Sequence, residues 1–257
     1  MNSIKLKQLA ALAALTALPC VASAAITIGA TASNRDSDSA GATNTISSFE
    51  VVAGSNRKLV LTLASETAAF VTGITFGGQS FIKAVDTGTT RMAQIWYLDD
   101  ATVGTADIVA TFDANARSAM AVVSLTGAAA GGPSAFAADD VFVDVDTTKA
   151  SFDFTTTEAN TFVIGNYTQN NGNGQPINPS SMTDLFLSDS GSSNAAMGYQ
   201  IQTIAGQSTY TWEAPATFEI NTSNGVAMAS FSSIPEPGTY ALLAGLAGLS
   251  FVMLRRR

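Results

Sequence analysis

The sequence predicts an all-β protein, an antiparallel and jelly-roll-like β-sandwich with an N-terminal signal peptide and a single C-terminal transmembrane helix. Short β-branched and aromatic runs recur through the middle of the chain, and turn residues separate them. No apolar stretch of helical length occurs outside the two ends. We therefore divide the chain into a signal peptide at 1–24, a β-sandwich domain at 25–233 and a C-terminal segment at 234–257.

The first 24 residues have the pattern of a secretory signal peptide. Lys5 and Lys7 precede an apolar stretch, and the small residues from Ala22 to Ala24 form a signal-peptidase site. We expect cleavage after Ala24 and export of everything that follows. Cys20, the one cysteine, lies in this leader, so the exported chain can form no internal disulfide.

The middle of the chain consists of strand-like runs in which alternate residues are apolar. The clearest runs are Lys58 to Ser65, Met92 to Leu98, Ala106 to Phe112, Ala119 to Leu125 and Asn160 to Tyr167. Glycine-rich and aspartate-rich turns, such as the one at 131–133, separate such runs. The run around Trp96 is echoed by one around Trp212, and two comparable strand sets favour a jelly roll or a similar Greek key.

The composition argues against catalysis and against binding to nucleic acid. The 257 residues are 46% hydrophobic and 12% charged, and they include no histidine, the commonest general base and metal ligand. No nucleophile elbow, phosphate loop or redox pair is present, and we predict that the protein is not an enzyme. Residues 25–234 hold seven basic and nineteen acidic side chains, a net charge of −12, which repels phosphate backbones.

Two acidic segments are candidate calcium sites. A loop from Asn34 to Asn44 could fold Asp36 and Asp38 around the hard cation, although the sequence matches no complete calcium-binding loop. The run from Asp139 to Asp146 places its carboxylates on one strand face at ~7 Å intervals, too far apart to surround an ion. We interpret that face as solvated, and no other cofactor is predicted.

An exposed aromatic ring would be the usual platform for a sugar. Trp96 and Trp212 both lie in strand-like runs, where packing in the core is the ordinary role of tryptophan. Trp212 is the better ligand candidate, because Glu213 and Pro215 follow it closely. A lectin-like function rests on this residue.

The C-terminal segment contains an apolar run followed by three arginines. Tyr240 to Leu254 holds 15 uncharged residues. As a helix it would reach ~23 Å, somewhat short of the ~30 Å hydrocarbon layer, and flanking residues could extend it. The basic cluster of Arg255, Arg256 and Arg257 would stop this helix with its C-terminus on the cytoplasmic side.

An extended, proline-rich motif precedes this helix. Pro235 and Pro237 fix the backbone on either side of Glu236 and exclude a helix or a central strand there. The order of Pro-Glu-Pro, short apolar helix and terminal arginines resembles the PEP-CTERM sorting signal of Gram-negative bacteria. The resemblance implies that an exosortase recognises Pro235, Glu236 and Pro237, removes the helix and transfers the domain to the cell surface or matrix.

These observations predict an exported surface or extracellular-matrix protein with a structural or adhesive role in the envelope or biofilm. It would be held in the membrane by its C-terminal helix before processing, with exopolysaccharide as a candidate polymer partner. The alternatives are a surface carbohydrate-binding module and, more distantly, a secreted carbohydrate-active enzyme.

Overall fold

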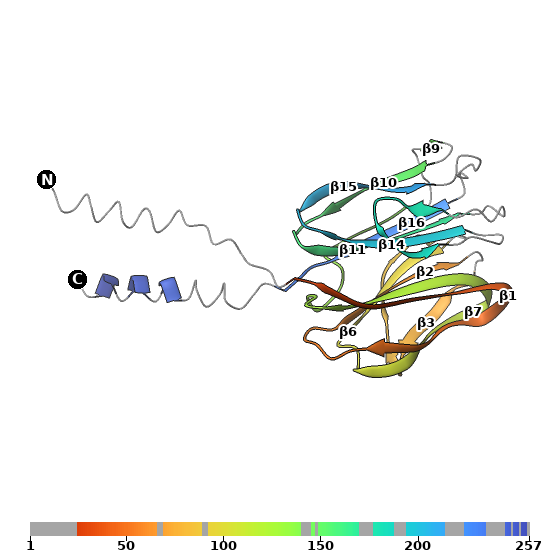
Figure 1. The fold of residues 1–257 in the computed structure, drawn as a ribbon, viewed down its shortest axis with the longest axis horizontal. Coiled ribbons are helices and arrows are strands. Elements are labelled where there is room, and N and C mark those ends of the chain that lie inside the picture. Colours follow the sequence, from red (N-terminus) through yellow and green to blue (C-terminus); the bar gives the residue numbers. More distant parts are fainter. Residues whose placement is uncertain are drawn as a thin grey trace. The chain divides into compact units, whose positions relative to one another are not determined.

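The computed structural model describes residues 25–65, 69–88, 92–139, 145–146, 149–169, 177–187, 194–213, 224–234, 245–247, 249–251 and 253–255. The chain forms two units, which we describe separately. Ala25–Ser233, called the body below, is built from antiparallel strands (Figure 1). The other unit comprises residues 1–24 and 234–257.

The strands of the body form three sheets. The first, called the bent sheet, contains β1 (Thr27–Val51), β2 (Lys58–Ser65), β3 (Val71–Phe76), β4 (Gln79–Ser80), β5 (Ile82–Asp86), β6 (Met92–Asp99) and β7 (Gly104–Thr126). The middle sheet contains β8 (Ala135–Asp139), β11 (Thr161–Gln169), β13 (Thr183–Leu187), β14 (Asn194–Gln202) and β16 (Asn224–Phe231). The outer sheet contains β9 (Val145–Asp146), β10 (Lys149–Thr156), β12 (Asn178–Pro179) and β15 (Gly206–Glu213).

The bent sheet folds over itself along its two longest strands. The first half of β7 pairs with β3 and its second half pairs with β2, while β1 pairs with both halves. The runs 106–112 and 119–125, predicted as two strands, are therefore parts of one strand. The segment predicted as a loop at Asn34 to Asn44 is also backbone of β1, interrupted by register shifts between Asp36 and Thr43.

Three large apolar cores separate the layers, and a smaller cluster, Ala64, Ala119, Ala121, Ala195 and Met197, lies beside the second of them. One lies within the bent sheet and includes Leu59, Leu61, Leu63, Ile74, Phe76, Ile108 and Val122. One lies between the bent and middle sheets and includes Val60, Ile95, Val123, Phe162, Ile164, Ala229 and Phe231. One lies between the middle and outer sheets and includes Phe154, Val163, Tyr167, Tyr210, Trp212 and Met228. The predicted antiparallel sandwich is thus confirmed, but it has three cores where a jelly roll of two facing sheets has one.

Strands in the interior of this stack are buried on both faces. Every residue of β2 and of β11 is buried. In β2, Leu61 faces one core and Val60 the next; in β11, Phe162 and Val163 divide in the same way. Such strands need apolar side chains at successive positions, because successive side chains point to opposite faces. The predicted alternation of apolar and polar residues is therefore absent at the centres of these runs, where Leu59 to Leu61 and Phe162 to Ile164 are apolar at successive positions.

One charged side chain is buried where the chain passes from the bent sheet to the middle sheet. Lys58 is 1% exposed, and its Nζ lies 2.6 Å from Asp99 Oδ1 and donates to the Gly131 carbonyl at 2.6 Å. The Gly131 N–H donates to Asp99 Oδ2 at 2.7 Å. Nζ also lies 4.9 Å from the ring centre of Tyr97 and 5.1 Å from that of Phe231. The loop between β7 and β8 is therefore fastened to β2 and β6 by one ion pair and its hydrogen bonds.

Burial shifts the protonation equilibrium of this amine. Desolvation lowers the pKa of Lys58 below its ordinary value of 10.5, and the hydrogen bond and negative charge of Asp99 act in the opposite direction. The carboxylate thus keeps a buried amine charged that burial alone would tend to neutralise.

We predict that Asp99→Ala destabilises the body more than removal of both charges does. The single change leaves a buried ammonium without its counterion, a loss of about 3 kcal/mol at most, since Asp99 is 27% exposed. Lys58→Met combined with Asp99→Asn leaves no unpaired charge and should cost less. Chemical denaturation at pH 7 measures all three proteins, and a double variant no more stable than Asp99→Ala would contradict this assignment.

The deficit of Asp99→Ala should also shrink as the pH rises from 7 toward 10.5. Without Asp99 the pKa of Lys58 falls further, so the folded variant releases this proton at a lower pH than the unfolded chain does. Where the unfolded state binds more protons, stability rises with pH. Unfolding free energies of both proteins at several pH values test this, and a deficit that is constant or grows with pH would refute it.

Candidate functional site at the C-terminal end of the body

The body begins and ends at the same end of the fold. Thr27 at the start of β1 pairs with Thr126 at the end of β7. Two residues later, Ala128 forms an isolated antiparallel bridge with Ser233, and the Ala129 N–H donates to the Ser232 carbonyl at 2.8 Å. Residues 126–129 therefore hold both the first strand and the last residue of the body.

A glycine makes this close approach possible. Gly127 has a φ of 74°, and a Cβ built on it would lie 2.8 Å from the Ala25 carbonyl oxygen. Both the positive φ and the lack of space exclude a larger residue without rearrangement. The first described residue of the chain is thus packed against the segment that also carries Ser233.

The strand leading to the exit is central in its sheet. β16 pairs with β11 on one side and β8 on the other. Its last residue, Phe231, pairs with Phe162, whereas its first, Asn224, pairs with Gln169 at the opposite end of β11. The C-terminal segment is therefore attached to a strand that is hydrogen-bonded on both edges.

The predicted sorting residues Pro235, Glu236 and Pro237 lie outside the described residues, as do Arg256 and Arg257. Residues 245–247, 249–251 and 253–255 are helical, and Arg255 is among them. In the described helical residues the large apolar side chains are more than half exposed: Leu246, Leu249, Phe251, Met253 and Leu254.

Within the part of the chain that is described, no helix has both the length and the apolar character required to cross a membrane.

The signal-peptidase residues Ala22 and Ala24 also lie outside the described residues. Asp36 and Asp38 belong to the backbone of β1, but their side chains are not described. No group of three or more acidic, histidine or cysteine residues that could hold a metal occurs among the residues that are described. A calcium site at Asp36 and Asp38 stays a prediction.

Trp212 is not an exposed platform, and the sugar-binding assignment to it is wrong for this conformation. Its side chain is 0% exposed and stacks on Tyr167, with ring centres 5.8 Å apart. Gly165 on β11 allows the two methionines and the indole to pack closely, because a Cβ there would lie 2.6 Å from Met228 Sδ, 3.1 Å from Met182 Cε and 3.2 Å from Trp212 Cζ2. Burial of a large ring in the third core is the ordinary outcome for a strand tryptophan.

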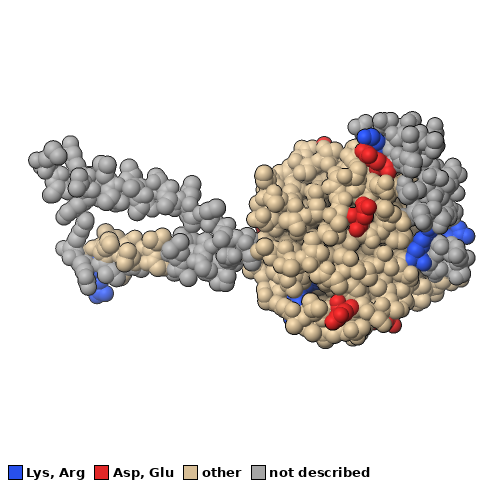
Figure 2. All heavy atoms as spheres, in the orientation of Figure 1, with Lys and Arg blue, Asp and Glu red and all other residues tan. Residues whose placement is uncertain are grey.

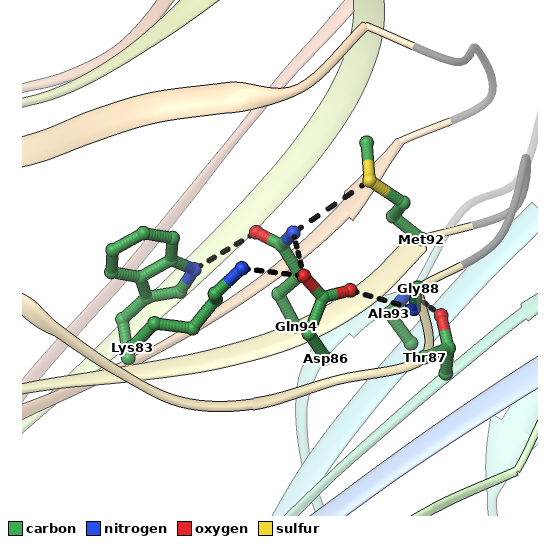
Figure 3. Close-up of polar contacts among 8 residues, drawn as sticks. Lys83, Asp86, Thr87, Gly88, Met92, Ala93 and Gln94 are labelled. Atoms are coloured by element: carbon green, nitrogen blue, oxygen red, sulfur yellow. Dashed lines mark hydrogen bonds and ion pairs between the residues drawn. The ribbon is translucent and has the colours of Figure 1, made fainter.

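Trp96 is buried too, beside a polar network that the sequence did not reveal (Figure 3). Its indole N–H donates to Gln94 Oε1 at 2.9 Å, and the Gln94 amide donates to Asp86 Oδ2 at 3.0 Å. Lys83 Nζ lies 2.7 Å from the same carboxylate oxygen and 5.8 Å from the Trp96 ring centre. Only the register of β5 against β6 brings these residues together.

This network borders a groove between two sheets. Lys83 to Asp86 of β5 and Phe136 to Ala138 of β8 line an open space of about 460 Å³. Phe136 is 62% exposed, and Ile82, which precedes the lining residues of β5, is 54% exposed. Neither run had a recognisable motif in the sequence. Alanine-rich composition around one exposed phenylalanine was the only available signal.

The face of the body seen in Figure 2 is mostly uncharged, with separate acidic and basic side chains. Basic residues do not gather into a patch on the visible described surface. This agrees with the low charge content of the sequence and gives no support to a nucleic-acid interface.

Comparisons with known proteins identify the C-terminal segment. The family described as the PEP-CTERM protein-sorting motif matches residues 233–257. A search of curated proteins finds no match to the chain. Among solved structures, a conserved protein of unknown function from Pseudomonas aeruginosa PAO1 aligns with 80% of this chain and 100% of its own, at 10% identity and a TM-score of 0.25. That likeness is too low to inform fold or function.

The match begins at Ser233, the residue that closes the body by its bridge to Ala128. It includes the proline motif, the apolar run and the terminal arginines, so the resemblance inferred from these residues is confirmed. Such a motif implies an exported protein that an exosortase processes. The chain therefore carries a C-terminal PEP-CTERM sorting motif after its β-sandwich body.

Proposed function

We propose that this protein is an exported structural or adhesive component of the cell surface or extracellular matrix, released from its sorting segment by an exosortase. The observation that carries the proposal is the position of the motif, which starts at the last residue of a compact body with its own cores. Cleavage beyond Ser233 would leave all three cores intact.

The exposed apolar side chains of the tail support a membrane-bound precursor. The described helical residues bury little of their apolar surface against protein. Apolar surface of this kind gains free energy on transfer into lipid. In the proposal the run from Tyr240 to Leu254 enters the membrane, and Arg255, Arg256 and Arg257 stay on the cytoplasmic side.

The body supports a role in packing and contact more than one in chemistry. Its large aromatic rings, including Trp212 and Tyr210, lie in the cores. The acidic side chains visible in Figure 2 are separate from one another. The one tryptophan that suggested a lectin is buried. A structural or adhesive role needs only a stable shape and a contact surface, and the described residues offer both.

We predict that mature protein recovered from the cell surface lacks the C-terminal helix. Mass spectrometry of the producing organism's surface fraction should find peptides of the body and none beyond about Pro237, because the helix is removed. Glu236→Ala should block this step and leave the full chain in the membrane fraction.

Glu158→Ala is the matched control, since it removes the same charge from an exposed position in the body. It should be processed like the unmodified chain. Recovery of surface protein that still carries Arg255 would count against processing, and equal processing of Glu236→Ala would show that this carboxylate is not read.

A further inference from the structure

The edge strands of the three sheets differ in how well they are protected from pairing with another chain. Natural proteins protect edge strands by making them short, bulged or charged, because an open edge pairs with other chains. The terminal strands β4, β9 and β12 are two residues long each. Register shifts interrupt β1, β5 and β13. Among the described terminal strands longer than two residues, β8 alone pairs along its whole length without a register shift, although β1 has a regular stretch from Thr31 to Asp36.

Open stretches also exist on β10 and β15, where short strands cover only part of their length. That of β10 carries Asp153. That of β15 is bonded by Ser180 at Thr211 only, and the rest of it, Gly206 to Tyr210, is uncharged but polar. The stretch from Ala135 to Ala138 on β8 is uncharged. It is apolar throughout, whereas the open stretch of β15 and the regular stretch of β1 carry polar side chains, so it is the most apolar regular edge in the described part of the body.

The side chains of β8 divide into two kinds. Ala135 and Ala137 pack partly against the third core. Phe136 and Ala138 are exposed and lie on the side that faces β5, where they line the groove described above. The exposed side of β8 thus presents one large ring, Phe136, and one small methyl group, Ala138, two residues apart.

We propose that β8 is the contact through which two copies of this body associate, in an antiparallel pair centred on Ala137. In this arrangement Phe136 of each copy lies opposite Ala138 of the other, so that each ring meets a small side chain and the groove beside it. Asp139 lies opposite Ala135, so no like charges face each other. The contact is isologous and closes as a dimer.

Charge on the neighbouring strand is complementary in the same arrangement. β5 and β8 run in the same direction, because Ile82 and Ala135 both lie toward the end that holds Ser233. The two-fold axis that relates the β8 strands therefore places Lys83 of each copy across from Asp86 of the other. These two residues flank the groove at the level of Phe136 to Ala138.

The inference concerns residues of the body alone and does not depend on processing of the tail. The body has its own cores, so residues 25–234 are a suitable protein for the test. Sedimentation equilibrium should show a dimer that dissociates on dilution. Ala138→Lys places a charge on the exposed edge and should weaken dimerisation at least tenfold, as protective lysines do.

Ile204→Lys is the matched control, because Ile204 is 75% exposed and lies outside β5 and β8. It should leave the dimer unchanged. Lys83→Asp would bring like charges together and should weaken the dimer, whereas Lys83→Asp with Asp86→Lys should restore it. Circular dichroism verifies that each variant is folded.

A disulfide cross-link tests whether Ala137 of the two copies lies at the proposed two-fold axis. The exported chain has no cysteine, so Ala137→Cys introduces a single thiol at the proposed two-fold axis. Oxidation should convert this variant to a covalent dimer much faster than Ile204→Cys. A body that stays monomeric at about 0.5 mM, or a dimer that neither Ala138→Lys nor Lys83→Asp weakens, would overturn the proposal.

Discussion

The ion pair of Lys58 with Asp99 is the constraint on which the arrangement of the layers depends. The chain builds the whole bent sheet first and then crosses, through residues 127–134, to start the middle sheet. Lys58 holds that crossing by donating to the Gly131 carbonyl, while Asp99 accepts from the Gly131 N–H. The same ammonium lies beside Phe231, at the end of the last strand. In a chain without disulfides, this buried charge thus adds to the apolar core between the bent and middle sheets by linking the crossing to the exit strand, and its cost is offset only while its partner is in place.

The strand content and the sorting tail could be predicted from the sequence, because both depend on local patterns. The β-branched and aromatic composition around Lys58 and Asn160 identified β2 and β11, and the order of Pro-Glu-Pro, apolar run and arginines identified the tail. What failed depends on long-range packing. Whether a strand has one buried face or two is decided by the layers that later strands supply, so three cores could not be read from local patterns. Trp212 is buried because Tyr167 and Met228, from two other strands, pack around it in the third core.

The groove beside β8 was missed for a related reason. Lys83, Asp86 and Phe136 come from separate parts of the chain, and only the stacking of two sheets places them together. Their significance comes from comparison with the other edges, which are bulged, very short, charged or polar. Lys83 is tied to Asp86 and covers Trp96, so the sheet edge of β5 is charged and irregular while the edge of β8 above it is neither. Protection of the other edges would direct association to one contact.

The symmetry of that contact has a consequence for a tethered protein. In an antiparallel pair of β8 strands the two bodies point in opposite directions, so Ser233 of one copy lies at the opposite end of the dimer from Ser233 of the other. Both copies could not be anchored side by side in one membrane through short linkers. The dimer would form between copies on two facing surfaces, or after an exosortase has freed at least one of them. The location of the exit at one end of the body and the polarity of β8 together couple the proposed removal of the tail to the proposed dimer: removal would permit association on one surface, and retention would favour contact between two.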